Sequence, residues 1–393
     1  MLKLGISVYP DIQSFDEIRN YIELAGRYGF TRVFSSMWSV EGTKEEILDY
    51  FRQFIQVSHE NHMEVDLDVN PDLFEKLGAS YDDVSVFADL GVDILRMDMA
   101  YDIEKSVILI NNPYDILIEF NASVVSERYI DALRKAGAGD KRILACHNFY
   151  PQRYTGMKWK TYLDNNAALK KDGVEVAAFI TSQNENTCGV WDAVCGLPTV
   201  ERMRDLPLDV QIRTMMAAGN VDCLLIGNAC ASEEELKQAP EILKEIEADE
   251  NNPVVEMMMK MGAGKEMFYP QKKIRVKLDE NISDVEKEIL LGFFPHSDVG
   301  DSSEWIWRSR MPRFLRKQVP ARKDDCEYFE PGTVLMVNDN YSHYAGEIQI
   351  ALLPLVNDGT RNRIGVLSDE EMEILKLVKD REVVVFLKEK NEV

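Results

Sequence analysis

One stretch of the sequence, YGFTRVFSS at residues 28–36, carries the pattern that decides the fold. A helix-like segment ends at Tyr28, a glycine follows at once, and the chain then enters the short apolar segment 32–36. A glycine just past a helix suits the left-handed cap that turns the chain back toward a sheet. The same order recurs around Gly91 and Gly173. The pattern predicts parallel strands that alternate with helices.

Eight short apolar runs follow one another in the first part of the chain. They span residues 4–8, 32–36, 64–69, 93–98, 116–121, 142–148, 176–182 and 223–228. Amphipathic segments such as 15–28 and 44–59 lie between them with helical spacing. Eight such units in about 230 residues predict a (β/α)8 TIM barrel. An open doubly wound sheet is the alternative, but polar residues cluster at the carboxyl end of nearly every run, which favours the barrel.

The pattern changes after the eighth run. Apolar runs that are typical of strands span residues 274–278, 333–337, 347–352, 364–367 and 383–387, with short helices expected near 283–291 and 368–379. We therefore expect a catalytic barrel over residues 1–250, a Met- and Gly-rich linker over 251–268, and a small, mostly-β domain over 269–393.

The net charge of the chain limits which classes of partner it can bind. Lys and Arg total 45 and Asp and Glu total 68, which gives a net charge of −23. Such a surface repels nucleic acids and anionic membranes, so we expect neither as a partner. No apolar run approaches the roughly 18 residues of a membrane helix, and the N-terminus lacks the features of a signal peptide. We expect a cytoplasmic protein whose six cysteines are free thiols, since they form no C-x-x-C pair.

Acidic residues stand at the predicted carboxyl ends of three neighbouring strands, which is where barrels of this type place their active sites. Period-two alternation puts three pairs of polar residues on the barrel side of their strands. The pairs are Asp66 with Asp68, Arg96 with Asp98, and Glu119 with Asn121. Carboxylates that converge push one pKa up, as a general acid at neutral pH requires. Two carboxylates across a glycosidic bond are the minimal equipment for glycoside hydrolysis.

Structural roles for the same residues stay open. Strand-end acids often cap the next helix, and Arg96 could simply neutralise Asp98. His147 could be a hydrogen-bonded structural residue, a substrate contact, or a metal ligand together with the nearby acids. We expect no metal, because His147 is isolated from the other histidines in the sequence. The loop aromatics Trp38, Tyr150, Trp159 and Trp191 fit a sugar ligand but are equally compatible with ordinary packing.

The stretch from Arg308 to Lys323 is locally basic within a very acidic protein and contains no acidic residue. Arginine can bind a phosphate or carboxylate in a bidentate manner. The alternative is an exposed loop that pairs with acidic neighbours. No P-loop or G-x-G-x-x-G pattern is present, so the sequence indicates no nucleotide cofactor.

Several of these segments together resemble a known family. They are LGISVYP at 4–10, LDV at 67–69, RMD at 96–98, IEFN at 118–121, CHNFYPQ at 146–152, FITS at 179–182, IGNA at 226–229 and Arg308-Ser309. The chain resembles the 6-phospho-N-acetylmuramidase family, glycoside hydrolase family 170, whose members were long labelled "outer surface protein". The likeness covers essentially the whole chain, and the string HNFYPQ is its most specific part.

The resemblance implies a TIM barrel followed by a small cyclophilin-like domain. It implies hydrolysis of the β-1,4 bond of N-acetylmuramic acid 6-phosphate–N-acetylglucosamine during the recycling of cell-wall sugars. We expect no cofactor. A cytoplasmic location and an anionic small-molecule substrate agree with the composition of the chain.

Roles in this reaction can be assigned to the strand-end residues. We expect Asp98 and Glu119 to be the catalytic pair, with Asp68 in reserve. The residues expected to contact the sugars are Ser7, Arg96, Asn121, His147, Asn148, Tyr150, Gln152, Ser182 and Asn228. Arg308 and Ser309 are the candidates for binding the 6-phosphate. The seventh strand ends in Thr181-Ser182 instead of a carboxylate, which leaves room for an inverting or substrate-assisted route.

Other functions remain as competitors. A metal-assisted isomerase or lyase would lose activity with a chelator, whereas the glycosidase would not. A class I aldolase needs a lysine at a strand end for its Schiff base, and none of the eight run ends has one. A non-catalytic binder of sugar phosphates would bind the disaccharide without cleaving it.

Overall fold

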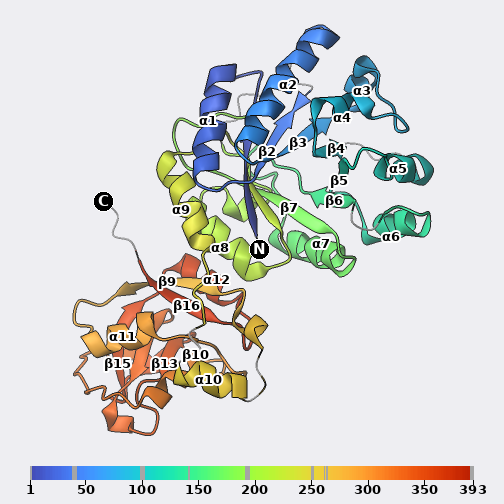
Figure 1. The fold of residues 1–393 in the computed structure, drawn as a ribbon. Coiled ribbons are helices and arrows are strands. Elements are labelled where there is room, and N and C mark those ends of the chain that lie inside the picture. Colours follow the sequence, from blue (N-terminus) through green and yellow to red (C-terminus); the bar gives the residue numbers. More distant parts are fainter. Residues whose placement is uncertain are drawn as a thin grey trace. The chain divides into compact units, whose positions relative to one another are not determined.

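The computed structural model describes residues 2–37, 42–97, 102–139, 142–190, 195–248, 252–260, 262 and 264–389. The chain forms two compact units (Figure 1). The first ends at Leu243 and the second begins at Lys244, and residues Met216–Ala218 group with the second. The limits drawn from the sequence at 250 and 269 stay a prediction. None of the described helices combines the length and the apolar character that crossing a membrane requires.

The first unit is a closed barrel of eight parallel strands. The strands are β1 (Lys3–Val8), β2 (Arg32–Ser36), β3 (Glu64–Val69), β4 (Ile94–Met97), β5 (Leu117–Asn121), β6 (Ile143–Cys146), β7 (Glu175–Ile180) and β8 (Cys223–Ile226). Pairing of β1 with β8, in which Gly5 lies opposite Leu225, closes the sheet. The predicted TIM barrel is confirmed, and an open doubly wound sheet is excluded because this sheet has no edge strand.

Helices surround the barrel (Figure 1). They are α1 (Phe15–Arg27), α2 (Lys44–Glu60), α3 (Pro71–Leu77), α4 (Ser85–Leu90), α5 (Ile103–Ile110), α6 (Glu127–Lys135), α7 (Trp159–Lys171), the 3-10 helix η3 (Glu201–Met203), α8 (Leu208–Ala218) and α9 (Glu233–Leu243). Capping boxes start α1 at Ser14 and α2 at Thr43. The three glycines that mark the helix-to-strand turns, Gly29, Gly91 and Gly173, have φ of 84°, 88° and 70°, as the left-handed cap requires.

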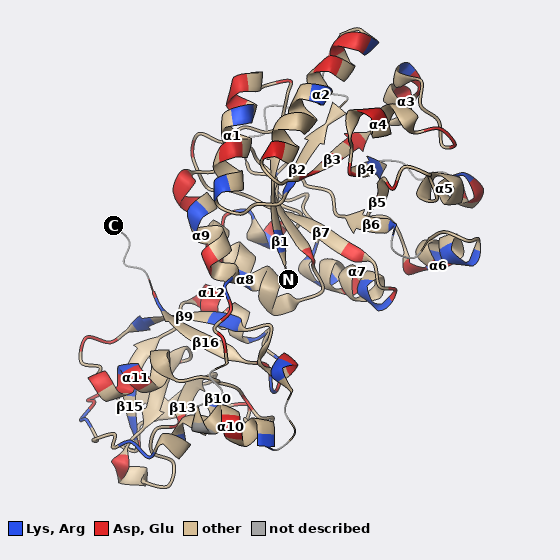
Figure 2. Ribbon diagram, in the orientation of Figure 1, with Lys and Arg blue, Asp and Glu red and all other residues tan. Residues whose placement is uncertain are grey.

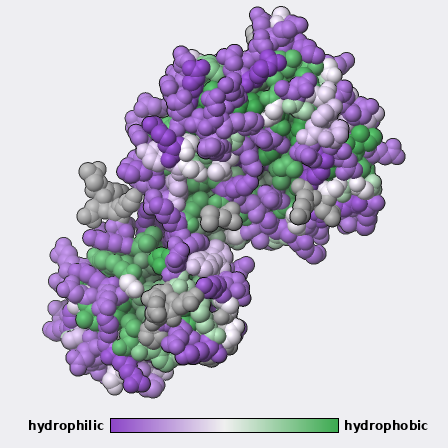
Figure 3. All heavy atoms as spheres, viewed as in Figure 1, coloured by the Kyte–Doolittle hydropathy of each residue, from purple (hydrophilic) through white to green (hydrophobic). Residues whose placement is uncertain are grey.

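In the first unit, charged residues lie mainly on the outer helices (Figure 2). The face in Figure 3 is accordingly mostly hydrophilic, with smaller apolar areas between. The barrel lumen is partly apolar: Phe34, Cys146, Phe179 and Leu225 belong to one buried cluster inside it. The charged groups that enter the lumen are therefore exceptions that call for partners.

The second unit is built on a six-stranded mixed sheet with the order β10-β13-β12-β15-β9-β16. Its elements are α10 (Pro253–Lys260), η4 (Lys265–Phe268), β9 (Lys272–Leu278), α11 (Asp284–Gly292), β10 (Ile306–Ser309), η5 (Met311–Leu315), β11 (Tyr328–Phe329), β12 (Thr333–Val337), η6 (Asp339–Tyr341), β13 (Ile348–Ala351), β14 (Leu355–Val356), β15 (Arg361–Val366), α12 (Asp369–Leu375) and β16 (Val384–Lys388). The β9–β16 pair is parallel, whereas the other neighbours in this sheet are antiparallel. The cyclophilin-like topology implied by the resemblance stays a prediction.

Candidate active site

Charged side chains from four adjacent strands meet inside the barrel. The register places Asp68 of β3 beside Arg96 of β4, and Arg96 beside Glu119 of β5. Side chains alternate between the two faces of a strand, so Asp66 lies in the same lumen one layer below Asp68. Arg32 of β2 completes the group. Each of these five residues is at most 9% exposed.

The deeper part of the group is a guanidinium shared by two carboxylates. Arg32 Nη2 lies 2.5 Å from Asp66 Oδ2 and also contacts Glu119 Oε2. Burial raises the pKa of Asp66 to about 7, and the nearby Glu119 adds to this shift against the opposing effect of Arg32. Asp66 Oδ1 and Glu119 Oε1 have no hydrogen-bond partner among the described residues. A proton on Asp66 relieves the repulsion between the two carboxylates.

The upper part of the group centres on Arg96. Its Nη1 lies 2.7 Å from Asp68 Oδ1, and its Nη2 donates to Asn148 Oδ1 at 2.5 Å. Its Nε lies 3.9 Å from Glu119 Oε1. Burial by itself lowers the pKa of Arg96, but the neighbouring acidic groups, of which Asp68 is the strongest, together raise it above its usual value, so the guanidinium stays charged. Arg96 thus links the buried Glu119 to the more accessible Asp68.

The structure describes two of the three predicted catalytic residues, Glu119 and Asp68. Asp98 lies outside the described residues. Glu119 points into the barrel as the alternation predicts, but its side chain is fully buried and contacts Arg32 below the rim. Asp68 is 9% exposed, which makes it the most accessible of the described carboxylates in this group.

The residues around His147 hold the loop after β6. His147 is fully buried, its Nε2 lies 2.7 Å from Asn166 Oδ1, and its Nδ1 lies 3.2 Å from Ser123 Oγ. Burial lowers the pKa of His147 to about 4, so the ring is neutral at physiological pH. Asn121 Oδ1 accepts a hydrogen bond from Ser123 N. These contacts support a structural role for His147 and Asn121 beneath Asn148.

Other predicted sugar contacts differ in their exposure. Ser7 is fully buried, and Ser182 and Asn228 bond to each other: Ser182 N donates to Asn228 Oδ1 at 2.8 Å. Tyr150 is half-buried and Gln152 is exposed on the loop after β6. Trp159 stacks on Tyr162 with 5.5 Å between ring centroids, while Trp38 and Trp191 lie outside the described residues.

Arg308 and Ser309 lie on β10 and point to opposite faces of its sheet. Arg308 Nη2 lies 2.7 Å from Glu347 Oε2, and its guanidinium carbon lies 5.6 Å from the Tyr344 ring centroid. Ser309 is fully buried, with its Oγ 3.1 Å from His296 Nδ1. The two side chains therefore cannot bind one phosphate together.

The rest of the basic stretch is largely paired with acids. Arg310 lies 2.8 Å from Asp301 and Lys323 lies 2.9 Å from Asp325. Arg313, Lys317 and Arg322 also lie near carboxylates. Most of these cations thus pair with acidic neighbours, which was the alternative to a phosphate-binding role for the basic stretch.

Two features of the site were not expected from the sequence. Arg32 stands at the start of its strand, and the alternation Arg32, Phe34, Ser36 would have indicated that it enters the lumen. The second is an ion pair between Glu201 and Arg204, 2.7 Å apart, that holds the loop after β6. Glu201 Oε1 accepts from Tyr154 N at 2.6 Å and its Oε2 accepts from Gly156 N at 2.8 Å.

A metal centre has no counterpart in the part of the chain that the structure describes. Among those residues, no group of three or more His, Cys, Asp or Glu side chains is arranged to hold an ion.

Fold and site together define a (β/α)8-barrel protein with ionisable groups inside its lumen, of which Asp68 and Arg96 lie toward the carboxyl ends of their strands, where such barrels bind substrates. Comparison with protein families identifies it more closely. Residues 4–241 match the N-terminal domain of 6-phospho-N-acetylmuramidase, and residues 272–387 match its C-terminal domain. The chain belongs to the 6-phospho-N-acetylmuramidase family, as its motifs indicated, and the family name supports a glycoside hydrolase that acts on a muramic acid phosphate.

Two solved structures share both units with this chain. An uncharacterized B. cereus protein is 32% identical, with a TM-score of 0.82 over 98% of this chain and 100% of that one. A conserved protein of unknown function from Enterococcus faecalis is 25% identical, with a TM-score of 0.66 over 98% of this chain and 96% of that one. A comparison with curated proteins found no match.

Proposed function

We propose that this protein hydrolyses the β-1,4 bond of N-acetylmuramic acid 6-phosphate–N-acetylglucosamine, as a cytoplasmic step in the recycling of cell-wall sugars. Membership of the family supports the reaction class. The observation that carries the proposal is that Arg96 contacts both Asp68 and Asn148, above the buried group formed by Arg32, Asp66 and Glu119.

In this proposal Asp68 is the carboxylate that meets the substrate. The Arg96 guanidinium, 2.7 Å away, stabilises its ionised form. An ionised carboxylate beside the anomeric carbon either attacks it, activates a water, or stabilises the positive charge of the transition state. Asp98 is the proposed general acid on sequence grounds, since it follows Arg96 by two positions and strand alternation would give it the same side.

Glu119 takes a different role in the proposal from the one first expected. Because its carboxylate is fully buried and contacts Arg32, it acts through Arg96 as a positioning residue. Glu119→Gln should lower kcat and shift the pH profile of kcat, while the KM for the disaccharide changes little. A change in KM alone, with kcat and its pH profile intact, would contradict this role.

Asp68→Asn tests the central claim. The amide keeps the shape of the side chain and an oxygen for Arg96 but removes the charge, so kcat should fall by about 10²–10⁴-fold. Release of N-acetylglucosamine from the phosphorylated disaccharide measures the rate. The matched control is Asp72→Asn, an exposed carboxylate in the first turn of α3, which should leave kcat unchanged. A near-normal kcat in a folded Asp68→Asn protein would refute the role of Asp68.

Arg308 is the proposed ligand of the 6-phosphate, without Ser309. It belongs to a cationic group with Arg313, since both lie near the buried Glu347 and both lie over the Tyr344 ring. Arg308→Ala should raise the KM for the phosphorylated disaccharide far more than the KM for its unphosphorylated form. Arg310→Ala, which removes an exposed arginine paired with Asp301, is the control. An equal effect on both substrates would remove Arg308 from the proposal.

A further inference from the structure

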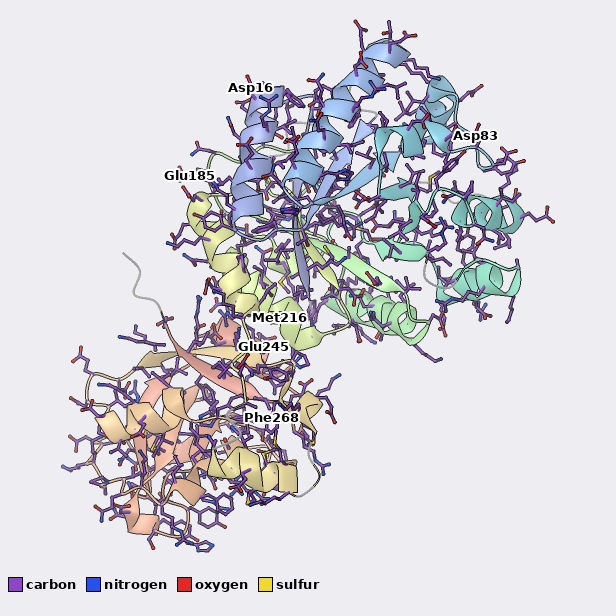
Figure 4. All side chains as sticks on the ribbon, viewed as in Figure 1. Asp16, Asp83, Glu185, Met216, Glu245 and Phe268 are labelled. Atoms are coloured by element: carbon purple, nitrogen blue, oxygen red, sulfur yellow. The ribbon has the colours of Figure 1, made fainter. Side chains whose placement is uncertain are left out.

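Two cysteines lie on neighbouring loops at the carboxyl ends of β7 and β8. Cys188 and Ala229 form an antiparallel bridge, in which Cys188 N donates to Ala229 O at 3.3 Å and Ala229 N donates to Cys188 O at 2.8 Å. Cys230 follows Ala229 directly, and both cysteines are half-buried free thiols. Glu185, labelled in Figure 4, marks the loop that carries Cys188. The backbone bridge therefore holds two half-buried cysteines close together in space.

The surroundings of Cys230 hold its sulfur in one place. Gln13 Nε2 donates to Cys230 Sγ at 3.4 Å, and Gln13 Oε1 is itself fixed by Tyr9 N at 2.8 Å. On the other side, Asn184 Nδ2 donates to the Cys230 carbonyl at 2.8 Å. Cys230 also adopts a left-handed backbone conformation with φ of 64°. This is an uncommon conformation for a residue other than glycine, and the surrounding hydrogen bonds hold it.

The two thiols also affect each other's ionisation. The nearby Cys188 thiol lowers the pKa of Cys230 to about 7, against the opposing effects of burial and of Glu17. The Cys230 thiol in turn raises the pKa of Cys188, to which burial, Glu17 and Asp11 add. One sulfur of the pair is thus the nucleophile, and the other keeps its proton.

The other cysteines with a shifted pKa differ from Cys230. Burial raises the pKa of Cys146 and Cys223, which belong to the apolar cluster inside the barrel. Burial and Asp324 raise the pKa of Cys326. A thiol reacts with oxidants as its thiolate, and fastest when its pKa is close to the ambient pH. Cys230 meets this condition and has a second thiol beside it.

We propose that Cys188 and Cys230 form a reversible dithiol–disulfide site that reacts with hydrogen peroxide. The Cys230 thiolate attacks one peroxide oxygen, the O–O bond breaks, and the departing hydroxide takes a proton and leaves as water. The Cys188 sulfur then attacks the resulting sulfenic acid. The S–S bond forms, and the sulfenic hydroxyl leaves as a second water with the Cys188 proton. The two sulfurs are oxidised by two electrons together, and the peroxide is reduced; a small thiol reverses the reaction by exchange.

The two cysteines lie on the loops that also carry Ser182 and Asn228. Ser182 and Asn228 join these loops through hydrogen bonds between the Ser182 backbone and the Asn228 side chain. A disulfide would join these loops covalently at the end of the barrel where the candidate active site lies. The inference does not depend on the proposed hydrolase activity, because its measurement is chemical.

The experiment uses the reduced full-length protein and one equivalent of hydrogen peroxide, followed by alkylation and peptide mapping by mass spectrometry. We expect the cross-linked peptide pair containing Cys188 and Cys230 as the main product, with a mass lower by two hydrogen atoms, and its loss on treatment with dithiothreitol. Cys188→Ser should leave Cys230 as a sulfenic acid that dimedone traps. Cys230→Ser should prevent oxidation at this dose. The matched control Cys326→Ser should react like the unchanged protein.

Several results would overturn the proposal. One is alkylation of Cys188 and Cys230 to completion after peroxide treatment, which means that no disulfide formed. Another is earlier oxidation of Cys195 or Cys326, which are also half-buried. If Cys188→Ser does not fold, as thermal unfolding would reveal, the peptide map of the unchanged protein decides the question by itself.

Discussion

The buried carboxylate pair makes a sharp prediction about stability and pH. Asp66 is fully buried, and its pKa is raised from 3.8 to about 7. In the unfolded chain the same group ionises near its ordinary pKa. Between these two values the folded protein binds a proton that the unfolded chain has lost, so the group lowers the free energy of unfolding as the pH rises. The contribution of Asp66 is least unfavourable in acid and is fully unfavourable above the folded pKa.

The size of the effect follows from the shift. About 3 pKa units correspond to about 4 kcal/mol. Asp66→Asn removes the titration and keeps an oxygen for the Arg32 guanidinium. The stability of Asp66→Asn relative to the unchanged protein should therefore increase by about 2 kcal/mol between pH 5 and pH 7 and level off above pH 7.

Equilibrium urea unfolding at several pH values, with pulse proteolysis to follow the peptides of the barrel, measures this difference separately from the second unit. The control is Asp115→Asn, because the Asp115 side chain is 99% exposed and should give no pH-dependent difference. The refuting result is a difference in unfolding free energy, Asp66→Asn minus the unchanged protein, that stays constant between pH 5 and pH 7 or falls as the pH rises. Either result would mean that Asp66 holds no proton in the folded protein.

Three further predictions concern single contacts. Gly5→Ala would place a Cβ too close to Leu225 Cδ2 and 2.7 Å from the Arg32 carbonyl oxygen. The free energy of unfolding, measured by thermal unfolding, should therefore fall by about 1–3 kcal/mol. The control Gly292→Ala, at the end of α11, should be tolerated because its Cβ would meet only an ordinary contact. Arg32→Met leaves two buried carboxylates without their guanidinium, so the free energy of unfolding in urea should fall by about 3–5 kcal/mol. Adding Asp66→Asn to this variant should restore part of that stability. If the losses from the two substitutions simply add, the pairing of Arg32 with Asp66 is contradicted. Glu201→Gln should speed proteolysis of the loop at 147–158 at neutral pH. Because Arg204 lowers the pKa of Glu201 to about 2, the difference in proteolysis rate between Glu201→Gln and the unchanged protein should vanish only as the pH falls toward about 2.

Much of the fold could be predicted because its signals are local. The barrel strands lie within two residues of the apolar runs, and β2 and β3 match their runs in full. In the second unit, β12 also matches in full, but β10 was interpreted as part of a basic loop. Its four residues are flanked by serines and charged residues, so its alternation is visible only once its pairing with β13 is known.

The candidate site was predictable in its residue types and less so in its roles. Alternation correctly places Glu119 inside the barrel, yet nothing in the sequence indicates how deep each strand position lies. Depth depends on the tilt and stagger of the strands around the closed sheet. That geometry leaves Asp68 the more accessible carboxylate and brings Arg32 to Glu119, which are far apart in the sequence.

The sequence alone determined the alternation of strands and helices, the eight-fold repeat and the family, because periodicity and motifs are properties of short segments. Only the tertiary structure decided which charges pair, which of them stay accessible at the rim, and which cysteines come together. The charge pairing depends on closing the barrel, because closure removes Asp66, Glu119 and Arg32 from water and leaves the two carboxylates and the guanidinium that they share to satisfy one another.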